Sequence, residues 1–128
     1  IVDLLTWMHQ NKVDYTNTFC YLMDLKEYDD DIYKDNDFQN WKKNWQERLK
    51  LNKNNPEKNI NLMRTVNPLV IPRNNKVEKA LEFAEKGDYS FLKKIITILK
   101  EPYELSQDKL DYQNPGPQQK NYQTFCGT

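Results

Sequence analysis

Apolar side chains recur along this chain at intervals of three and four residues, the spacing that lines up one face of an α-helix. About six such stripes lie between residues 1 and 102, and no stretch of useful length alternates as a β-strand would. The stripes consist of Ile1, Leu4, Leu5 and Met8; Tyr15, Phe19, Leu22 and Met23; Phe38, Trp41, Trp45 and Leu49; Ile60 and Met63; Val77, Ala80, Leu81 and Ala84; and Leu92, Ile95, Ile96 and Leu99. The pattern predicts an all-α fold with about six amphipathic helices.

Residues suited to helix starts stand before several stripes. Asp14 and Asn55 each offer a side-chain oxygen to the unpaired amides of a first turn, and Pro56 suits the first helical position. Asn75 stands three residues before Glu78, the spacing of a capping box, so a helix is predicted to begin there with Asn75 as its cap.

Other residues predict where helices end. Asn67–Pro68 closes the fourth helix, because a residue that precedes proline avoids the helical region. Segment 69–73 contains a second proline and is predicted to be extended. Gly87 suits the left-handed position after the fifth helix, Asp88 can cap the sixth, and Pro102 ends it.

The helical pattern is lost in residues 103–128, where Pro115, Gly116 and Pro117 disfavour regular structure. Aromatic residues nevertheless recur there at wide intervals, at Tyr103, Tyr112, Tyr122 and Phe125. We therefore predict an extended tail whose aromatic side chains pack into grooves, the alternative being a disordered tail, which is usually poor in aromatics. The expected organisation is a helical region over 1–102 followed by this tail.

Composition bears on whether the chain stands alone. The 128 residues are 38% hydrophobic and 30% charged, a low apolar share for an independent globule. The chain is therefore either a small polar helical domain or a piece of a larger protein that covers part of its apolar surface. Ile1 is not an initiator methionine and opens directly in a helical pattern, which favours the second interpretation.

Charge and hydropathy exclude two classes of partner. The 19 basic and 19 acidic residues give a net charge of +0, which argues against a non-specific nucleic-acid binder. The strongest basic group is flanked by acidic residues and is interpreted as a solvated helix face; it comprises Lys42, Lys43, Arg48 and Lys50. No run of about 18 apolar residues is present, so no membrane association is expected.

The chain carries no recognisable catalytic, cofactor or metal site. Its three glycines form no phosphate-binding loop, and kinase signatures are absent. The single histidine, His9, and two cysteines make no zinc site by any usual spacing. The run Asp29–Asp31 lacks the alternating ligand positions of a calcium loop and is interpreted as solvent-exposed.

Four positions remain of interest. Arg73 and Asn74 follow the proline-stiffened segment, where they serve either a rigid connector or a binding site, and Arg73 suits bidentate contact with a carboxylate or phosphate. Cys126 lies two residues from the last residue, and from spacing alone it is an ordinary accessible thiol. Cys20, within an apolar helix, is predicted to be a small core residue, and so few cysteines favour a reducing compartment.

A set of short motifs occurs in an order and spacing that chance does not explain. The motifs are Trp45-Gln46-Glu47-Arg48-Leu49, Met63, Asn67-Pro68, Ile71-Pro72-Arg73-Asn74, Val77-Glu78, Ala80-Leu81, Ala84, Gly87-Asp88, Leu99, Pro102-Tyr103, Tyr122 and Thr124-Phe125-Cys126-Gly127-Thr128. Together they resemble the C-terminal region of the selenoprotein O family, also called the YdiU family. The resemblance is good over 41–128 and looser over 1–33, where it rests mainly on Asp14-Tyr15-Thr16 and Phe19.

The resemblance implies a kinase-like, pseudokinase-type adenylyltransferase in the full-length protein, which moves AMP from ATP, with magnesium or manganese, onto hydroxyl side chains of protein substrates. The family's nucleotide, metal and catalytic residues lie upstream, so none is carried onto this chain. Cys126 matches the near-terminal cysteine of bacterial members, which implies a redox role and pairing with a cysteine of the absent part. Asn75 departs from the histidine usual in relatives.

Two functional hypotheses follow. In the first, the chain is a non-catalytic helical portion that braces the kinase-like core of a bacterial cytoplasmic adenylyltransferase and carries a redox cysteine, Cys126. In the second, it is an independent helical interaction module that docks partners on the stripe of Phe38, Trp41 and Trp45.

Overall fold

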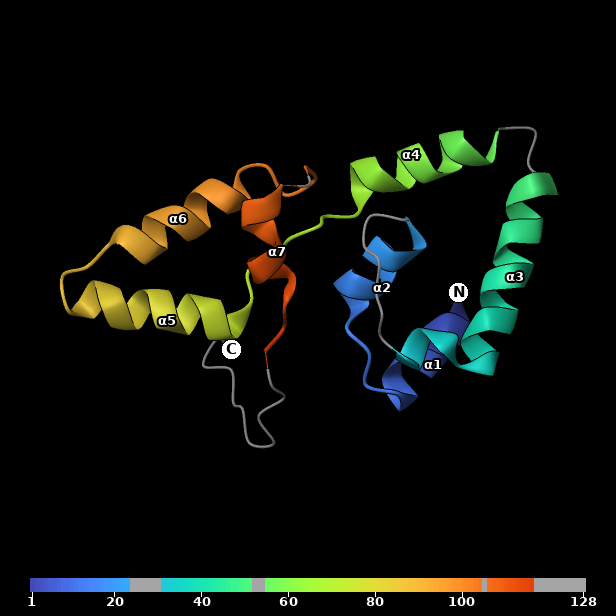
Figure 1. The fold of residues 1–128 in the computed structure, drawn as a ribbon, viewed down its shortest axis with the longest axis horizontal. Coiled ribbons are helices and arrows are strands. Elements are labelled where there is room, and N and C mark those ends of the chain that lie inside the picture. Colours follow the sequence, from blue (N-terminus) through green and yellow to red (C-terminus); the bar gives the residue numbers. More distant parts are fainter. Residues whose placement is uncertain (24–30, 52–54, 105, 117–128) are drawn as a thin grey trace. The chain divides into compact units, whose positions relative to one another are not determined.

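A computed structural model describes residues 1–23, 31–51, 55–104 and 106–116, and all regular structure within them is helical (Figure 1). The elements are α1 (Val2–Gln10), α2 (Tyr15–Leu22), a short 3-10 helix η1 (Asp31–Lys34), α3 (Asn36–Leu51), α4 (Pro56–Val66), α5 (Asn74–Glu85), α6 (Ser90–Leu99) and α7 (Gln107–Gln113). The predicted all-α fold is confirmed. No helix in the described part of the chain is both long and apolar enough to cross a membrane.

The chain divides into two compact units, residues 1–68 and residues 69–128. Helices α1 to α4 belong to the first unit, and α5 to α7 belong to the second. Helix α7 lies beyond residue 102, where the helical region was predicted to end.

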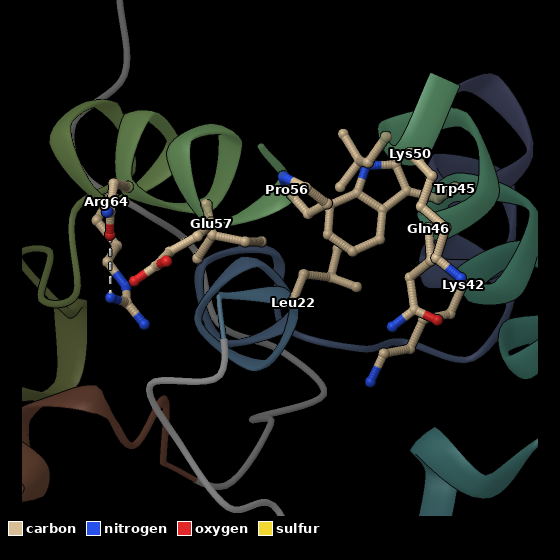
Figure 2. A pocket seen from close by; sticks show the side chains of 11 residues that line it. Leu22, Lys42, Trp45, Gln46, Lys50, Pro56, Glu57 and Arg64 are labelled. Carbon is tan, nitrogen blue, oxygen red and sulfur yellow. Dashed lines mark hydrogen bonds between the residues drawn. The ribbon is translucent and has the colours of Figure 1, made fainter. Parts of the chain in front are cut away.

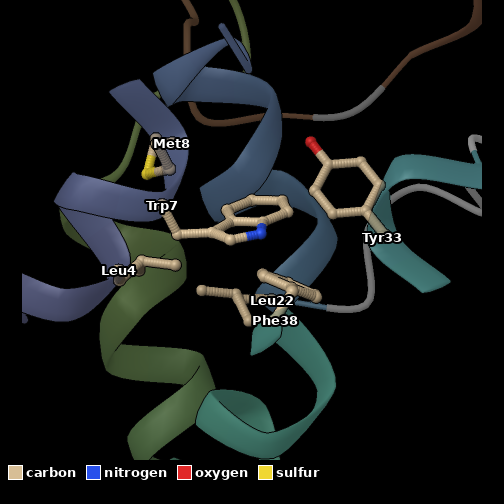
Figure 3. Close-up of a cluster of buried hydrophobic side chains, with 6 residues drawn as sticks. All are labelled: Leu4, Trp7, Met8, Leu22, Tyr33 and Phe38. Carbon is tan, nitrogen blue, oxygen red and sulfur yellow. The ribbon is translucent and has the colours of Figure 1, made fainter. Parts of the chain in front are cut away.

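A cluster of buried side chains forms the core of the first unit (Figure 3). Its members come from α1, α2, η1 and α3, and they are Leu4, Trp7, Met8, Leu22, Tyr33 and Phe38. Phe38 is completely buried, and its ring centroid lies 4.7 Å from that of Trp7 and 5.2 Å from that of Tyr33. Cys20 is also completely buried, as predicted. The apolar stripes of separate helices thus meet in one aromatic core.

The start of α3 is fixed to this core by Asp35. Its Oδ1 accepts hydrogen bonds from the Trp7 indole at 2.8 Å and from the Phe38 backbone amide at 3.1 Å. These bonds, with the one from the Phe38 amide contributing most, lower the pKa of the Asp35 carboxyl below its ordinary value of 3.8. Asp35 therefore stabilises the folded unit in its ionised form.

We expect the first unit to lose stability in acid partly through Asp35. A lowered folded-state pKa contributes stability above the unfolded pKa, near 4, and that contribution disappears as pH falls through the folded value. The Asp35→Asn variant should therefore show a shallower fall in urea midpoint between about pH 5 and pH 2. An Asp37→Asn variant, altered at the exposed neighbouring position, is the matched control. Parallel acid profiles for wild type and Asp35→Asn would contradict the assignment.

Most of the predicted helix boundaries are confirmed. Asp14 Oδ1 accepts from the Asn17 amide at 2.8 Å, and Asn55 Oδ1 accepts from the Glu57 amide at 3.1 Å, so both residues cap their helices. Gly87 has φ +85° just after α5, the left-handed conformation that glycine adopts without strain.

The predicted cap at Asn75 is wrong. Helix α5 begins at Asn74, and Arg73 is the last extended residue, with its carbonyl accepting from the Lys76 and Val77 amides at 2.9 Å each. The extended segment therefore ends two residues earlier than the capping-box spacing requires. The Asn75 side chain instead packs closely against Gly116, where a Cβ would collide with its amide nitrogen.

The second unit is built on the hairpin of α5 and α6, which run side by side (Figure 1). Ala80 of α5 and Ile95 of α6 are buried, and the Phe91 ring of α6 stacks on the Tyr112 ring of α7 at 6.3 Å between centroids. The predicted extended segment 69–73 is present, and the Leu69 amide donates to the Pro102 carbonyl at 2.7 Å.

Helix α7 corrects the prediction that the chain is extended throughout residues 103–128. The buried face of this short helix is partly polar, so it shows no apolar stripe: Lys109, Tyr112 and Gln113 are its buried residues. The Lys109 ammonium donates to the carbonyls of Glu101 at 2.7 Å and Glu104 at 2.9 Å. Tyr112 is buried, as predicted for the tail aromatics, but it lies on a helix. The prediction is wrong for Tyr103, which is 48% exposed. Residues 117–128, with Tyr122 and Phe125, lie outside the described residues.

Candidate functional site

Arg73 connects the segment before α5 to the end of α7, both in the second unit. Its Nη2 donates to the Gln113 carbonyl at 3.2 Å, and the Gln113 side-chain amide donates to the Leu69 carbonyl at 3.1 Å. Asn74, the first residue of α5, is exposed. These bonds account for Arg73 as part of a rigid connection, and a binding role for Arg73 or Asn74 stays a prediction.

Of the other residues considered from the sequence, the structure describes His9 and Asp31. Cys126 lies outside the described residues. His9 is exposed on α1, and Asp31 lies in η1 with its carboxylate 2.7 Å from the Lys34 ammonium. Among the residues that the structure describes, no group of three or more His, Cys, Asp or Glu side chains is placed to hold a metal ion.

A pocket with a volume of about 510 Å³ opens in the first unit between α2, α3 and α4 (Figure 2). We call it the α3–α4 pocket. Its apolar lining is Leu22, Trp45, Leu49, Pro56 and Ile60, and its polar lining is Lys42, Gln46, Lys50, Glu57, Asn61 and Arg64. The volume is in the range of small-molecule and side-chain binding sites.

The sequence places these residues by simple helical spacing. On α3 they occur at positions 42, 45, 46, 49 and 50, and on α4 at positions 56, 57, 60, 61 and 64, so each helix turns one face to the pocket. Trp45 and Met63 also pack against the core cluster of the first unit, which holds the two faces in place. In Figure 2 the Trp45 indole lies beside Leu22 and Pro56.

Arg64 is the most constrained polar side chain of the pocket. Its Nη2 donates to the Met23 carbonyl at 3.1 Å and its Nη1 to Asn61 Oδ1 at 3.2 Å. The buried Nε has no hydrogen-bond acceptor among the described residues. Two bonds therefore hold the Arg64 guanidinium in one orientation.

The pocket has an excess of positive charge. Among its described lining residues, Lys42, Lys50 and Arg64 are cationic and Glu57 alone is acidic. The Lys42 ammonium is held over the Tyr21 ring, 4.4 Å from its centroid. Such a site favours a ligand that combines a negative charge with an apolar group, because Lys42 and Lys50 line the pocket from the same helix as Trp45.

Sequence reasoning missed this pocket. It treated the basic residues near position 45 as a solvated helix face, whereas Lys42 is half-buried and both Lys42 and Lys50 line the pocket. The available signal was the matching spacing of mixed apolar and polar residues on two consecutive helices. The turn that brings these helices together could not be deduced from that spacing.

Comparison with known proteins gives the family. The model of a family described as protein adenylyltransferase SelO matches residues 1–100 of the chain. The chain belongs to the SelO family. The SelO match includes residues 1–33, where the sequence motifs gave only a loose resemblance, and the predicted family membership is confirmed.

Several SelO-family relatives align with the whole chain. Proteins named protein nucleotidyltransferase YdiU from Pelagibacter ubique and Bacillus mycoides are each 44% identical to it, and the alignments cover 100% of this chain and 27% of each relative. The protein of that name from Nitrosococcus oceani is 41% identical, with 26% of its length covered. The chain thus spans about a quarter of the length of these SelO relatives. No solved structure matches it.

Proposed function

We propose that this chain is a non-catalytic helical portion of a protein adenylyltransferase, an enzyme that transfers AMP from ATP to hydroxyl side chains of proteins. In this proposal it braces the kinase-like core of the longer protein. The observation that carries the proposal is the family match over residues 1–100, together with relatives named nucleotidyltransferases of which the chain covers only 26% to 27%. ATP, magnesium or manganese, and the protein substrates would be bound by the remaining part, in the bacterial cytoplasm.

The exposed apolar surface of the chain supports a bracing role. Large apolar side chains remain exposed on several helices, among them Leu62 (65%) and Val66 (63%) of α4, Leu81 (53%) of α5 and Ile96 (48%) of α6. Leu62 and Val66 are four residues apart and so share a face of α4. When another part of a protein covers apolar groups of this kind, the free energy of the protein in water falls.

We also propose a redox role for Cys126. In this role its thiol and a thiol of the remaining part form a disulfide, and the two protons and two electrons released pass to a cellular oxidant. The support is positional, since Cys126 matches the near-terminal cysteine of the family. The disulfide would fix the C-terminal segment to the core and so make activity depend on redox conditions.

One observation favours the alternative, an independent helical interaction module. Trp45 is half-buried and lines an open pocket, so part of the aromatic stripe is accessible. Phe38 is completely buried and is not available for docking. A docking surface in this alternative would therefore be the α3–α4 pocket rather than the whole stripe.

The proposal predicts that AMP transfer needs the longer protein. The full-length gene product should transfer labelled AMP from ATP to acceptor proteins, whereas the 128-residue chain should transfer none and should show no ATP-dependent rise in melting temperature. Both proteins are assayed side by side, with and without magnesium or manganese. Transfer by the chain alone, or its stabilisation by ATP, would contradict the proposal, and inactivity of both proteins would favour the interaction module.

A further inference from the structure

We propose that the α3–α4 pocket binds an acidic segment of the longer protein, whose apolar side chain seats against Trp45. This inference rests on the proposed function, because it names the surface by which the chain contacts the core that it braces. The segment would carry at least one carboxylate, directed at Lys50 and Arg64, next to an aliphatic or aromatic residue.

The charge of the pocket selects an anionic occupant. The described lining residues include three cations and one carboxylate, and each cation comes from a different helical turn. Arg64 is oriented by its bonds to Met23 and Asn61, so little conformational entropy remains to be lost when its guanidinium meets an anion. A carboxylate placed there would form a charge-assisted hydrogen bond, which is stronger than a neutral one.

The apolar lining selects a side chain rather than a free inorganic ion. Trp45, Leu49 and Ile60 border the same volume as the cations, and about 510 Å³ is more than a lone carboxylate would fill. A peptide segment offers a carboxylate and an apolar side chain at neighbouring positions. It would therefore satisfy both parts of the lining at once.

The same polypeptide is the favoured source of this segment. The chain covers 27% of the length of its relatives, so in proteins of that kind nearly three-quarters of the polypeptide lies outside the region described here. A segment that is covalently linked meets the pocket at a high effective concentration, which a separate protein does not.

Site-specific photo-crosslinking in the full-length gene product tests the proposal. A benzophenone amino acid replaces Gln46, which lines the pocket, and in a matched control it replaces Asn44, which is exposed on the same helix but is not part of the lining. Crosslinked peptides are identified by mass spectrometry. The expected result is a crosslink from position 46, and not from position 44, to a segment outside residues 1–128 that contains Asp or Glu beside an apolar residue.

Charge variants complete the test. Lys50→Glu should lower the yield of the position-46 crosslink by roughly tenfold, the factor that corresponds to about 1.4 kcal/mol. Lys50→Arg, which keeps the charge, should retain the yield, and because residue 50 is exposed neither change should prevent folding. Four outcomes would each overturn the proposal. They are crosslinks only within residues 1–128, crosslinks to another protein, no crosslink, and a yield that Lys50→Glu does not change.

The crosslinking result is independent of enzyme activity. A crosslink to the acidic segment in a protein that transfers no AMP would preserve the pocket assignment and remove the proposed activity. AMP transfer by a protein that gives no such crosslink would preserve the activity and remove the pocket assignment.

Discussion

Replacing Phe38 with alanine is expected to lower the free energy of unfolding of the first unit by about 3–5 kcal/mol. Phe38 is completely buried, and its ring contacts Trp7, Tyr33 and Trp41, with centroids 4.7, 5.2 and 6.4 Å away. The substitution removes the buried ring and leaves a cavity that rigid aromatic neighbours fill poorly. Urea unfolding followed by tryptophan fluorescence measures the change selectively, because all three tryptophans lie in residues 1–68.

Leu51→Ala provides the control for Phe38→Ala. Leu51 ends the same helix α3 and is 85% exposed, so its replacement should change the free energy of unfolding by no more than about 0.5 kcal/mol. Equal effects of the two substitutions would mean that Phe38 is not a core residue. A Phe38→Ala variant that stayed stable but no longer bound a partner would support the hypothesis that Phe38, Trp41 and Trp45 form a docking surface.

The helices that could be predicted from the sequence are those whose faces and ends are determined by residues close together in the chain. Stripes at spacings of three and four, side-chain caps at Asp14 and Asn55, and a glycine at position 87 all act within a few residues of one another. Phe38 could be placed on the apolar face of its helix for the same reason. Asn75 shows the limit of such reasoning, because its capping-box spacing to Glu78 places the cap two residues after the true cap position, Arg73.

Features that depend on contacts between distant residues could not be predicted. Helix α7 buries Lys109 and Gln113, and their polar groups are satisfied by the carbonyls of Glu101, Glu104 and Leu69. A sequence pattern registers these buried side chains as exposed polar residues. The α3–α4 pocket escaped notice for the same reason, since its cations lie on two helices and only the packing of the unit shows that they face one volume.

Replacing Arg73 with alanine is expected to destabilise the second unit by about 2 kcal/mol, within the range for hydrogen bonds to charged groups. The Arg73 guanidinium donates to the Gln113 carbonyl, the last carbonyl of α7, and Gln113 in turn donates to Leu69. Without the arginine, the end of α7 loses a bond that spans 40 residues of sequence and a cation that favours a helix C-terminus. Native-state hydrogen exchange of the α7 amides measures this loss, because it gives the free energy of opening for each unit separately.

Two further variants decide what Arg73 does. Arg48→Ala removes an exposed arginine from α3 in the first unit and should leave the exchange of α7 unchanged. Arg73→Lys retains the charge but not the planar fork, so it should restore only part of the protection. If Arg73→Ala left α7 protected and instead weakened binding of a carboxylate or phosphate ligand, the bond to Gln113 would be incidental and the binding interpretation of Arg73 would be correct. Because the guanidinium is half-buried and already holds Gln113, we expect α7 to lose protection.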